Sequence, residues 1–386
     1  MRLRRVLVRA VLVLVSGLAG LFICEMALRL QEPYFHLMER KYNYTAFIVS
    51  NPVWDHSLRP QTTLSFRWLE PAGSSQPIVY TTNREGCRYP RDPVIPKPRD
   101  VRRILVLGDS FTLGYSFEDS FAAQLERRLN SQSQARHYEV VNCASPSHSP
   151  LLYYLRLKNQ LVTLQPDELI LNIDATDIFD DYWRYRSRCQ FAPDGDPVAV
   201  SGSVRRTRGI LESALGRSYL ARVVWAFRST GSLPRGGRDA PADAKIFAYY
   251  STLPVESPAW QKEVGFCLGN ISRILNFCRE HGIVVNVTMV PHEQQFRPDA
   301  GGKLWNCEFD RRVERLCRDA GVSFYSPAEG LARAMNAGQT LYLENDMHFT
   351  VEGERLWSGL LANFYGAREG SRLERAKLAH SSAVAP

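Results

Sequence analysis

From residue 101 onward, short apolar runs alternate with stretches of helical periodicity, and this alternation constrains the fold more than any other feature of the chain. The predicted strands are apolar runs bounded by turn residues, at 104–107, 138–142, 168–173, 283–289 and 322–326. The predicted helices lie between and after them, at 116–130, 150–164, 259–280, 309–319 and 351–365. Strands that alternate with helices form a parallel sheet covered on both faces, so we predict an α/β fold with about five central strands.

The first of these strands ends in Gly108-Asp109-Ser110, within the stretch RRILVLGDSFTLG. Ligands of open α/β sheets bind at the carboxyl ends of the strands, so this turn lies at the predicted functional edge. A serine hydroxyl becomes a nucleophile only beside a base that a third group orients. Among the eight histidines, His348 is the best candidate base, because it precedes the last predicted helix and Asp346 lies two residues before it. Without such partners, Ser110 would be interpreted as a helix-entry turn residue.

The motifs VLGDSFTLG and DMHFTVEG, together with the spacing of the strand–helix units, resemble the end motifs of the SGNH (GDSL-type) hydrolase superfamily. The resemblance implies a flavodoxin-like three-layer fold and acyl-ester chemistry that needs no metal or organic cofactor. It implies that Ser110 is the nucleophile, His348 the base and Asp346 the group that orients the base. The family usually has this aspartate three residues before the histidine. The two-residue spacing found here is more similar to the polysaccharide O-acetyltransferase branch.

Two positions depart from the family's pattern. The glycine whose N–H contributes to the oxyanion hole corresponds to Ser147 in NCASPSHS, and the asparagine donor corresponds to Thr176 in DATDIFDD. Ser147 keeps a backbone N–H if the turn is kept, and the Thr176 hydroxyl is a donor of shorter reach. Loss of one oxyanion donor costs about 10²–10³ in turnover, so the changes indicate a specialised acyl transferase or a protein that has lost catalysis. His292, after the fourth predicted strand, is a further candidate for substrate contact.

Four aspartates follow the third predicted strand: Asp174, Asp177, Asp180 and Asp181. They raise the possibility of a metal site, but hydrophobic residues lie between them rather than the glycine-rich spacing of a calcium loop. We therefore predict a solvated loop and no metal site. The eight cysteines contain no C-x-x-C pair, so zinc or redox chemistry is not indicated, and the sequence does not determine their pairing.

The first thirty residues have a basic start followed by an uncharged run from Ala10 to Cys24. We predict a membrane anchor at 1–30 with its arginines in the cytoplasm and the rest of the chain in the periplasm or outside the cell. A cleaved signal peptide is the alternative, although no small-x-small cleavage site follows the apolar run. These residues hold five arginines and one glutamate, which is +4 of the net charge of +8. The remainder is only mildly basic, so a nucleic-acid partner is not indicated.

We predict four parts of the chain: the anchor at 1–30, an extended arm with short strands at 31–100, the hydrolase-like domain at 101–366, and a frayed tail at 367–386. The domain is expected to contain an inserted helical lid or subdomain at 182–258, with an amphipathic stretch at 210–227.

The expected function is that of an esterase or acetyl transferase acting on an ester outside the cytoplasm, with a carbohydrate as the favoured substrate. The first alternative is a catalytically inactive scaffold that binds glycan or organises an export complex. The second alternative is a membrane-tethered lipase with 210–227 as its lid.

Overall fold

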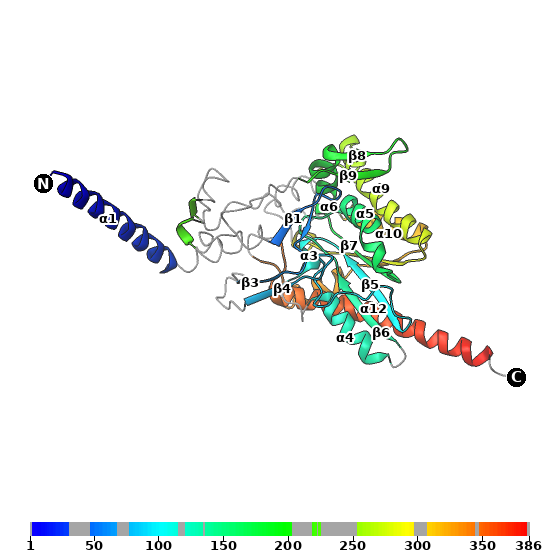
Figure 1. Cartoon of the computed structure of the whole chain (residues 1–386). Helices are drawn as coiled ribbons and strands as arrows, with labels where there is room; N and C mark the ends of the chain where they lie inside the picture. The colour runs from blue at the N-terminus through cyan, green and yellow to red at the C-terminus, as the bar shows by residue number, and fades with distance from the viewer. Residues whose placement is uncertain are drawn as a thin grey trace. The chain divides into compact units, whose positions relative to one another are not determined.

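The computed structural model of the 386-residue chain describes residues 2–30, 47–67, 77–114, 120–133, 136–202, 218–221, 223–224, 253–296, 307–343 and 347–383 (Figure 1). The chain divides into two compact units. The first unit comprises Met1–Val49, Leu64–Ile78 and Arg205–Arg238. The second unit comprises Ser50–Thr63, Val79–Val204 and Asp239–Pro386.

In the first unit, helix α1 (Arg2–Leu30) contains the predicted anchor. Its stretch Arg4–Leu30 is 27 residues long and contains an 18-residue window with a mean hydropathy of 2.5, which by length and composition is sufficient to cross a membrane. A signal sequence has the same properties. The structure therefore agrees with an N-terminal apolar helix, and both its insertion in a membrane and its direction there stay predictions.

Glu25 is the acidic residue of this apolar helix, and its carboxylate contacts part of the predicted insertion. It accepts hydrogen bonds from the backbone N–H groups of Tyr219 and Leu220 and from the Ser218 hydroxyl, each at 2.9 Å. Arg29 also donates to it at 2.9 Å. A charge that would be costly in an apolar surrounding is thus compensated by four donors.

The second unit is built on a parallel sheet of five strands in the order β11-β10-β7-β5-β6. The strands are β5 (Val101–Leu107), β6 (His137–Asn142), β7 (Glu168–Ile173), β10 (Val284–Met289) and β11 (Ser323–Tyr325). Counted along the chain, the spatial order is 2-1-3-4-5, the flavodoxin-like arrangement, so the predicted fold class is confirmed. The strand order reverses between β5 and β7, and ligands bind at such a switch point.

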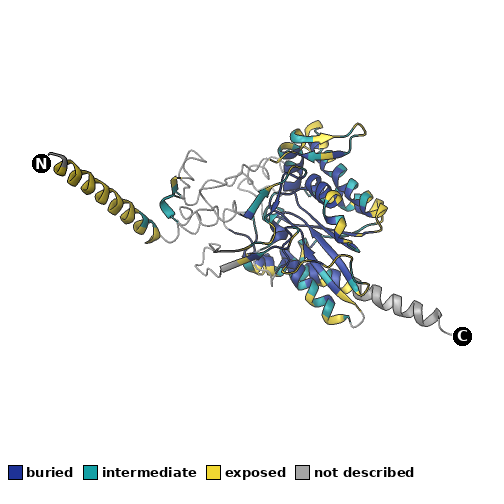
Figure 2. Ribbon diagram, viewed as in Figure 1, coloured by how far each residue is buried: buried dark blue, intermediate teal, exposed yellow. Residues whose placement is uncertain are grey.

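Helices cover both faces of this sheet, and the sheet is buried between them (Figure 2). One face, with Leu105 and Leu171, packs against α5 (Pro150–Asn159), α9 (Pro258–Glu280) and α10 (Glu308–Asp319). The other face, with Ile104 and Ile170, packs against α4 (Phe121–Gln132), α11 (Ala328–Asn336) and α12 (Val351–Ala383). Successive strand side chains point to opposite faces, so continuous apolar runs are what a sheet covered on both sides requires.

The described part of the arm contains the short strands β1 (Ile48–Ser50), β2 (His56–Leu58), β3 (Thr63–Arg67) and β4 (Pro77–Thr81). The segment that follows β4 is part of the core rather than a loose extension. Cys87 and Tyr89 are buried in the same apolar cluster as β5 and α9. The Sγ atoms of Cys87 and Cys143 lie 2.7 Å apart.

Two described segments differ from the predicted organisation. The predicted tail at 367–386 continues α12 as far as Ala383, because its alanine, lysine, arginine and glutamate residues favour helix. The start of the predicted helical insertion forms η2 (Asp180–Tyr185), η3 (Arg186–Arg188) and a hairpin of β8 (Cys189–Phe191) and β9 (Pro197–Val200). Tyr185 and Val200 are buried there, so this segment is core and not lid. Most of the amphipathic stretch 210–227 lies outside the described residues.

Candidate active site

The turn after β5 places Ser110 at the start of a one-turn helix, α3 (Ser110–Leu113). Asp109 caps this helix, since its Oδ1 accepts the Phe111 N–H at 2.9 Å. Gly108 has no room for a side chain, because a Cβ there would lie 2.1 Å from the Thr112 Oγ1. Gly114 ends the helix at a φ of +70°, which favours glycine.

Two asparagines at the ends of neighbouring strands hold α3 through Thr112. Asn142, the last residue of β6, donates from its Nδ2 to the Thr112 carbonyl at 2.9 Å. Asn172, near the end of β7, donates from its Nδ2 to the Thr112 Oγ1 at 3.0 Å. Sequence reasoning missed both residues, although a polar residue at the carboxyl end of an otherwise apolar strand is the pattern that marks them.

The arm holds the other end of α3. Arg88 is fully buried and donates to the carbonyl oxygens of Leu113 and Gly114, the latter at 2.9 Å. The Tyr80 hydroxyl donates to the same Gly114 oxygen at 2.5 Å, and its ring lies 4.1 Å from the Arg88 guanidinium. Cationic donors at the last carbonyls of a helix compensate acceptors that have no partner inside it.

The predicted nucleophile and base meet. The Ser110 Oγ lies 2.7 Å from the His348 Nε2, although the two residues are 238 positions apart in sequence. Both residues are partly exposed, and the Phe111 ring stacks on His348 at a centroid distance of 4.8 Å. A serine that donates to Nε2 leaves the imidazole hydrogen on Nδ1. Asp346 lies outside the described residues, so its role as the orienting group stays a prediction.

The motif that contains Ser147 forms a tight turn beside α3. The His148 N–H donates to the Ser145 carbonyl at 3.1 Å, and the Ser145 N–H donates to the Gly108 carbonyl at 3.1 Å. Pro146 followed by a residue with positive φ is the pattern of a type II turn, and Ser147 has a φ of +57°. This conformation costs a residue other than glycine about 1–2 kcal/mol. The turn is therefore kept despite the serine, and with it the candidate donor N–H.

Thr176 and His292 both contact Asp174, which follows β7. The Thr176 hydroxyl donates to the Asp174 Oδ1 at 2.5 Å, so donation to an oxyanion would require it to exchange this partner. The His292 Nε2 lies 3.4 Å from the same oxygen, and the His292 side chain is 2% exposed. Burial alone would raise the pKa of Asp174, but the contacts with His292 and Thr176 hold it below its ordinary value. Both assigned roles stay predictions, and the burial of His292 does not favour direct substrate contact.

The predicted solvated loop is wrong, because the aspartates after β7 are buried. Asp177 accepts the Asp174 N–H at 3.0 Å, and Asp181 accepts the Leu151 N–H at 2.9 Å. Burial raises the pKa of Asp181 to about 7 and raises the pKa values of Asp109 and Asp177 well above the ordinary range. These carboxyl groups support local backbone. Within the described ranges, no group of three or more His, Cys, Asp or Glu side chains is arranged to hold a metal ion.

Comparison with known proteins agrees with this geometry. The profile of the GDSL-like lipase/acylhydrolase family matches residues 106–356, which is more than half of the chain. No curated protein sequence matches significantly.

Similar solved structures include a lipase/acylhydrolase from Enterococcus faecalis, at 12% identity and a TM-score of 0.39 over 69% of this chain and 96% of that one. An acetyl-xylooligosaccharide esterase from Geobacillus is similar at 11% identity and a TM-score of 0.41 over 68% and 93%. An acetyl xylan esterase is similar at 13% identity and a TM-score of 0.38 over 67% and 97%. These identities are too low to transfer a substrate. On the match of its sequence to the family profile, this chain belongs to the GDSL-like lipase/acylhydrolase family.

Proposed function

We propose that this protein cleaves acyl esters through a covalent acyl-serine at Ser110, with His348 as general base. The observation that carries the proposal is the 2.7 Å separation between the Ser110 Oγ and the His348 Nε2. Nucleophilic acyl transfer needs a serine within hydrogen-bond distance of a base. Here the serine also lies on a turn at the switch point of the sheet, where ligands bind.

In the first half-reaction, the Ser110 Oγ attacks the ester carbonyl carbon while its proton passes to the His348 Nε2. The negative charge develops on the former carbonyl oxygen, where the Ser147 N–H is the proposed donor. The ester C–O bond then breaks, and His348 returns the proton to the leaving alcohol. Asp346 is proposed to hold the Nδ1 hydrogen of His348 throughout. In the second half-reaction, water or another hydroxyl group attacks the acyl-serine by the same route.

The N-terminal helix supports the finer part of the proposal. An N-terminal apolar helix with arginines at its start favours a catalytic unit outside the cytoplasm. Ester groups on envelope or exported carbohydrates are the substrates available there. The spacing of Asp346 and His348 resembles that of the polysaccharide O-acetyltransferase branch, and this resemblance slightly favours acetyl transfer to a sugar hydroxyl over hydrolysis.

The catalytically inactive scaffold remains the second candidate, and a single observation favours it. The Thr176 hydroxyl donates to Asp174 at 2.5 Å and is therefore not free to donate to an oxyanion in this structure. An enzyme with one fewer donor would be slow by about 10²–10³-fold, whereas a scaffold would show no serine-dependent turnover at all.

The test uses the full-length protein in detergent with p-nitrophenyl acetate and p-nitrophenyl octanoate. Ser110→Ala is compared with Ser131→Ala, a control in which an exposed serine of α4 is replaced. We expect Ser110→Ala to lose roughly 10⁴-fold or more of turnover and the control to keep it. Mass spectrometry of the acid-quenched enzyme should find an acyl group on Ser110.

Added xylo- or manno-oligosaccharides that speed p-nitrophenol release and become acetylated would identify a transferase. Release that stays the same with these sugars would identify a hydrolase. A preference for the octanoate would instead favour the lipase alternative. Equal turnover in the wild type and Ser110→Ala, with no acylated Ser110, would refute the proposal and leave the scaffold.

A further inference from the structure

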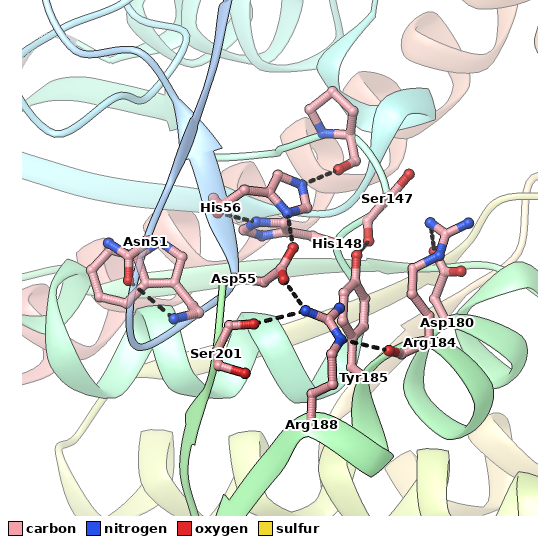
Figure 3. A network of polar contacts seen from close by, with 12 residues as sticks. Asn51, Asp55, His56, Ser147, His148, Asp180, Arg184, Tyr185, Arg188 and Ser201 are labelled. Carbon is pink, nitrogen blue, oxygen red and sulfur yellow. Dashed lines mark hydrogen bonds and ion pairs between the residues drawn. The ribbon is translucent and has the colours of Figure 1, made fainter. Parts of the chain in front are cut away.

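A polar network from the arm surrounds the turn that contains Ser147 (Figure 3). The His56 Nδ1 lies 2.7 Å from the Asp55 Oδ2, and the His56 Nε2 lies 2.7 Å from the Pro146 carbonyl oxygen. Asp55 and His56 are 2% and 5% exposed, so these hydrogen bonds are shielded from water. A segment that precedes the central sheet by more than forty residues thus reaches the NCASPSHS turn beside the active site.

The two hydrogen-bond partners of His56 determine which of its ring nitrogens carry a hydrogen. A carboxylate oxygen and a carbonyl oxygen are both acceptors, so His56 satisfies both contacts only when each ring nitrogen carries a hydrogen. Burial would raise the pKa of Asp55, but His56 and Arg188 outweigh that effect and hold it well below its ordinary value. His148 packs edge-on against the His56 ring at 4.8 Å and donates to the His56 carbonyl at 2.7 Å. Burial and the neighbouring His56 charge lower the pKa of His148, which stays neutral.

The contact with Pro146 bears directly on the Ser147 N–H. The Pro146 carbonyl and the Ser147 N–H belong to one planar peptide unit and point in opposite directions. A donor fixed on the carbonyl therefore fixes the direction of the N–H. A cationic donor also polarises the peptide, which makes the N–H a stronger donor at its other end.

Tyr185 fixes the next peptide unit. Its hydroxyl donates to the Ser147 carbonyl at 2.5 Å, so the carbonyls on both sides of the Ser147 Cα are held. Arg188 closes the network, because it donates to the Asp55 Oδ1 at 2.5 Å and its guanidinium lies 5.4 Å from the centre of the Tyr185 ring. Figure 3 shows Asp55, His56, Ser147, Tyr185 and Arg188 arranged around this turn.

We propose that Asp55 and His56 are positioning residues that orient the Ser147 N–H toward the oxyanion, with Tyr185 and Arg188 completing the clamp. The proposal rests on the proposed function, because it assumes that an oxyanion forms beside Ser110. It also explains how serine occupies a left-handed position that favours glycine. Residues in strained conformations persist where their surroundings over-determine them, and here both flanking carbonyls are held.

The experiment compares two variants at His56 in the full-length protein. His56→Phe keeps a ring of similar size but removes both donors, and His56→Gln keeps one N–H within reach of the Pro146 oxygen. Tyr89→Phe is the matched control, since Tyr89 is buried and its hydroxyl bonds to Glu126 at 2.9 Å and to Arg91 at 2.6 Å rather than to the turn. The readouts are kcat and KM for p-nitrophenyl acetate, affinity for phenylboronic acid, melting temperature, and amide exchange in residues 143–152.

We expect His56→Phe to lower kcat by about 10–100-fold with KM within about twofold, because a misplaced donor acts on the transition state alone. Affinity for phenylboronic acid, which forms a tetrahedral anion on serine, should fall by a similar factor. Amide exchange at Ser147 should quicken. His56→Gln should recover most of these losses, and Tyr89→Phe should leave kcat, the affinity and the Ser147 exchange unchanged.

If His56→Phe does not fold, Tyr185→Phe is used instead, because it removes a single hydroxyl. It should lower kcat and the phenylboronic acid affinity and speed the Ser147 amide exchange, each by a smaller factor. Losses in kcat that match those of Tyr89→Phe at equal melting temperature, or no rescue by His56→Gln, would overturn the proposal. Amide exchange at Ser147 does not depend on turnover. It therefore tests the clamp even if Ser110→Ala shows that the proposed chemistry is absent, and unchanged exchange in His56→Phe and Tyr185→Phe would refute it.

Discussion

Thr112→Val tests whether the strand-end asparagines stabilise the helix of the nucleophile. Valine has nearly the shape of threonine, so the substitution creates no cavity and keeps the contact with Gly108. It removes the Oγ1 that accepts the Asn172 Nδ2 at 3.0 Å, and the two side chains are 1% and 2% exposed. The Asn172 donor is then buried without this acceptor, which costs about 1–3 kcal/mol of unfolding free energy.

The assay is urea unfolding of the full-length protein in detergent, followed by tryptophan fluorescence, in a double-mutant cycle with Asn172→Leu. Each single variant should lose about 1–3 kcal/mol. The double variant should lose less than the sum by at least about 0.5 kcal/mol, because removing both partners leaves no unpaired group. Turnover of Thr112→Val should fall as well, since Ser110 lies on the same short helix, and a displacement of 1 Å costs up to about 10²-fold.

Thr163→Val is the control, because its hydroxyl is on an exposed residue and donates to the Gln160 carbonyl at 2.7 Å. It should change the unfolding free energy by no more than about 0.5 kcal/mol. Strict additivity in the cycle, or a Thr112→Val protein as stable as this control, would show that the hydrogen bond does not hold α3.

Three further predictions follow from buried or paired groups. Burial raises the pKa of Asp181 to about 7, so the folded state holds this proton more tightly than the unfolded state. The contribution of this group to stability should be full below about pH 4 and should fall by up to about 4 kcal/mol as the pH rises past 7. Urea melts of Asp181→Asn should show a smaller loss over the same pH range. Refolding with oxidised glutathione should join Cys87 to Cys143, which are 56 residues apart, with loss of two hydrogens in the intact mass and a gain of up to about 4 kcal/mol; an unchanged mass would contradict this. Glu25→Ala should speed amide exchange at Leu220 by at least about tenfold, because the carboxylate that accepts this N–H at 2.9 Å is lost; equal exchange would show that α1 does not hold this segment.

The sequence predicts well those structural features that depend on residues close together along the chain. Apolar runs bounded by turn residues identified all five strands of the central sheet, because a sheet covered on both faces requires such runs. The Ser110–His348 pair was also predictable, since both residues lie in motifs at the functional edge and the structure joins them. Helix α11 was missed because it is short and separated from β11 by only two residues.

The features that the sequence did not reveal depend on contacts between residues that are far apart along the chain. Nothing in the residues around His56 or Arg88 marks them as neighbours of the active site, because the arm has no periodicity and these contacts are to the NCASPSHS turn and to α3. The aspartates after β7 were misjudged for the same reason. Whether a carboxylate is buried depends on the backbone N–H groups that other elements bring to it, such as that of Leu151 for Asp181.

The clamp around Ser147 also sets an order of events during folding. During synthesis, His56 can form its hydrogen bond only after Pro146, 90 residues later, has been made. Asp55 can pair with Arg188 only after a further segment, which ends 133 residues after Asp55, has been made. At a synthesis rate of about 5–20 residues per second, the second wait is on the order of 10 s, so the arm leaves the ribosome long before its partner. The turn that presents Ser110 closes over a few residues and can form early, whereas the turn that presents Ser147 gains its final geometry late. Slow arm docking would therefore appear in refolding experiments as activity that returns after the secondary structure.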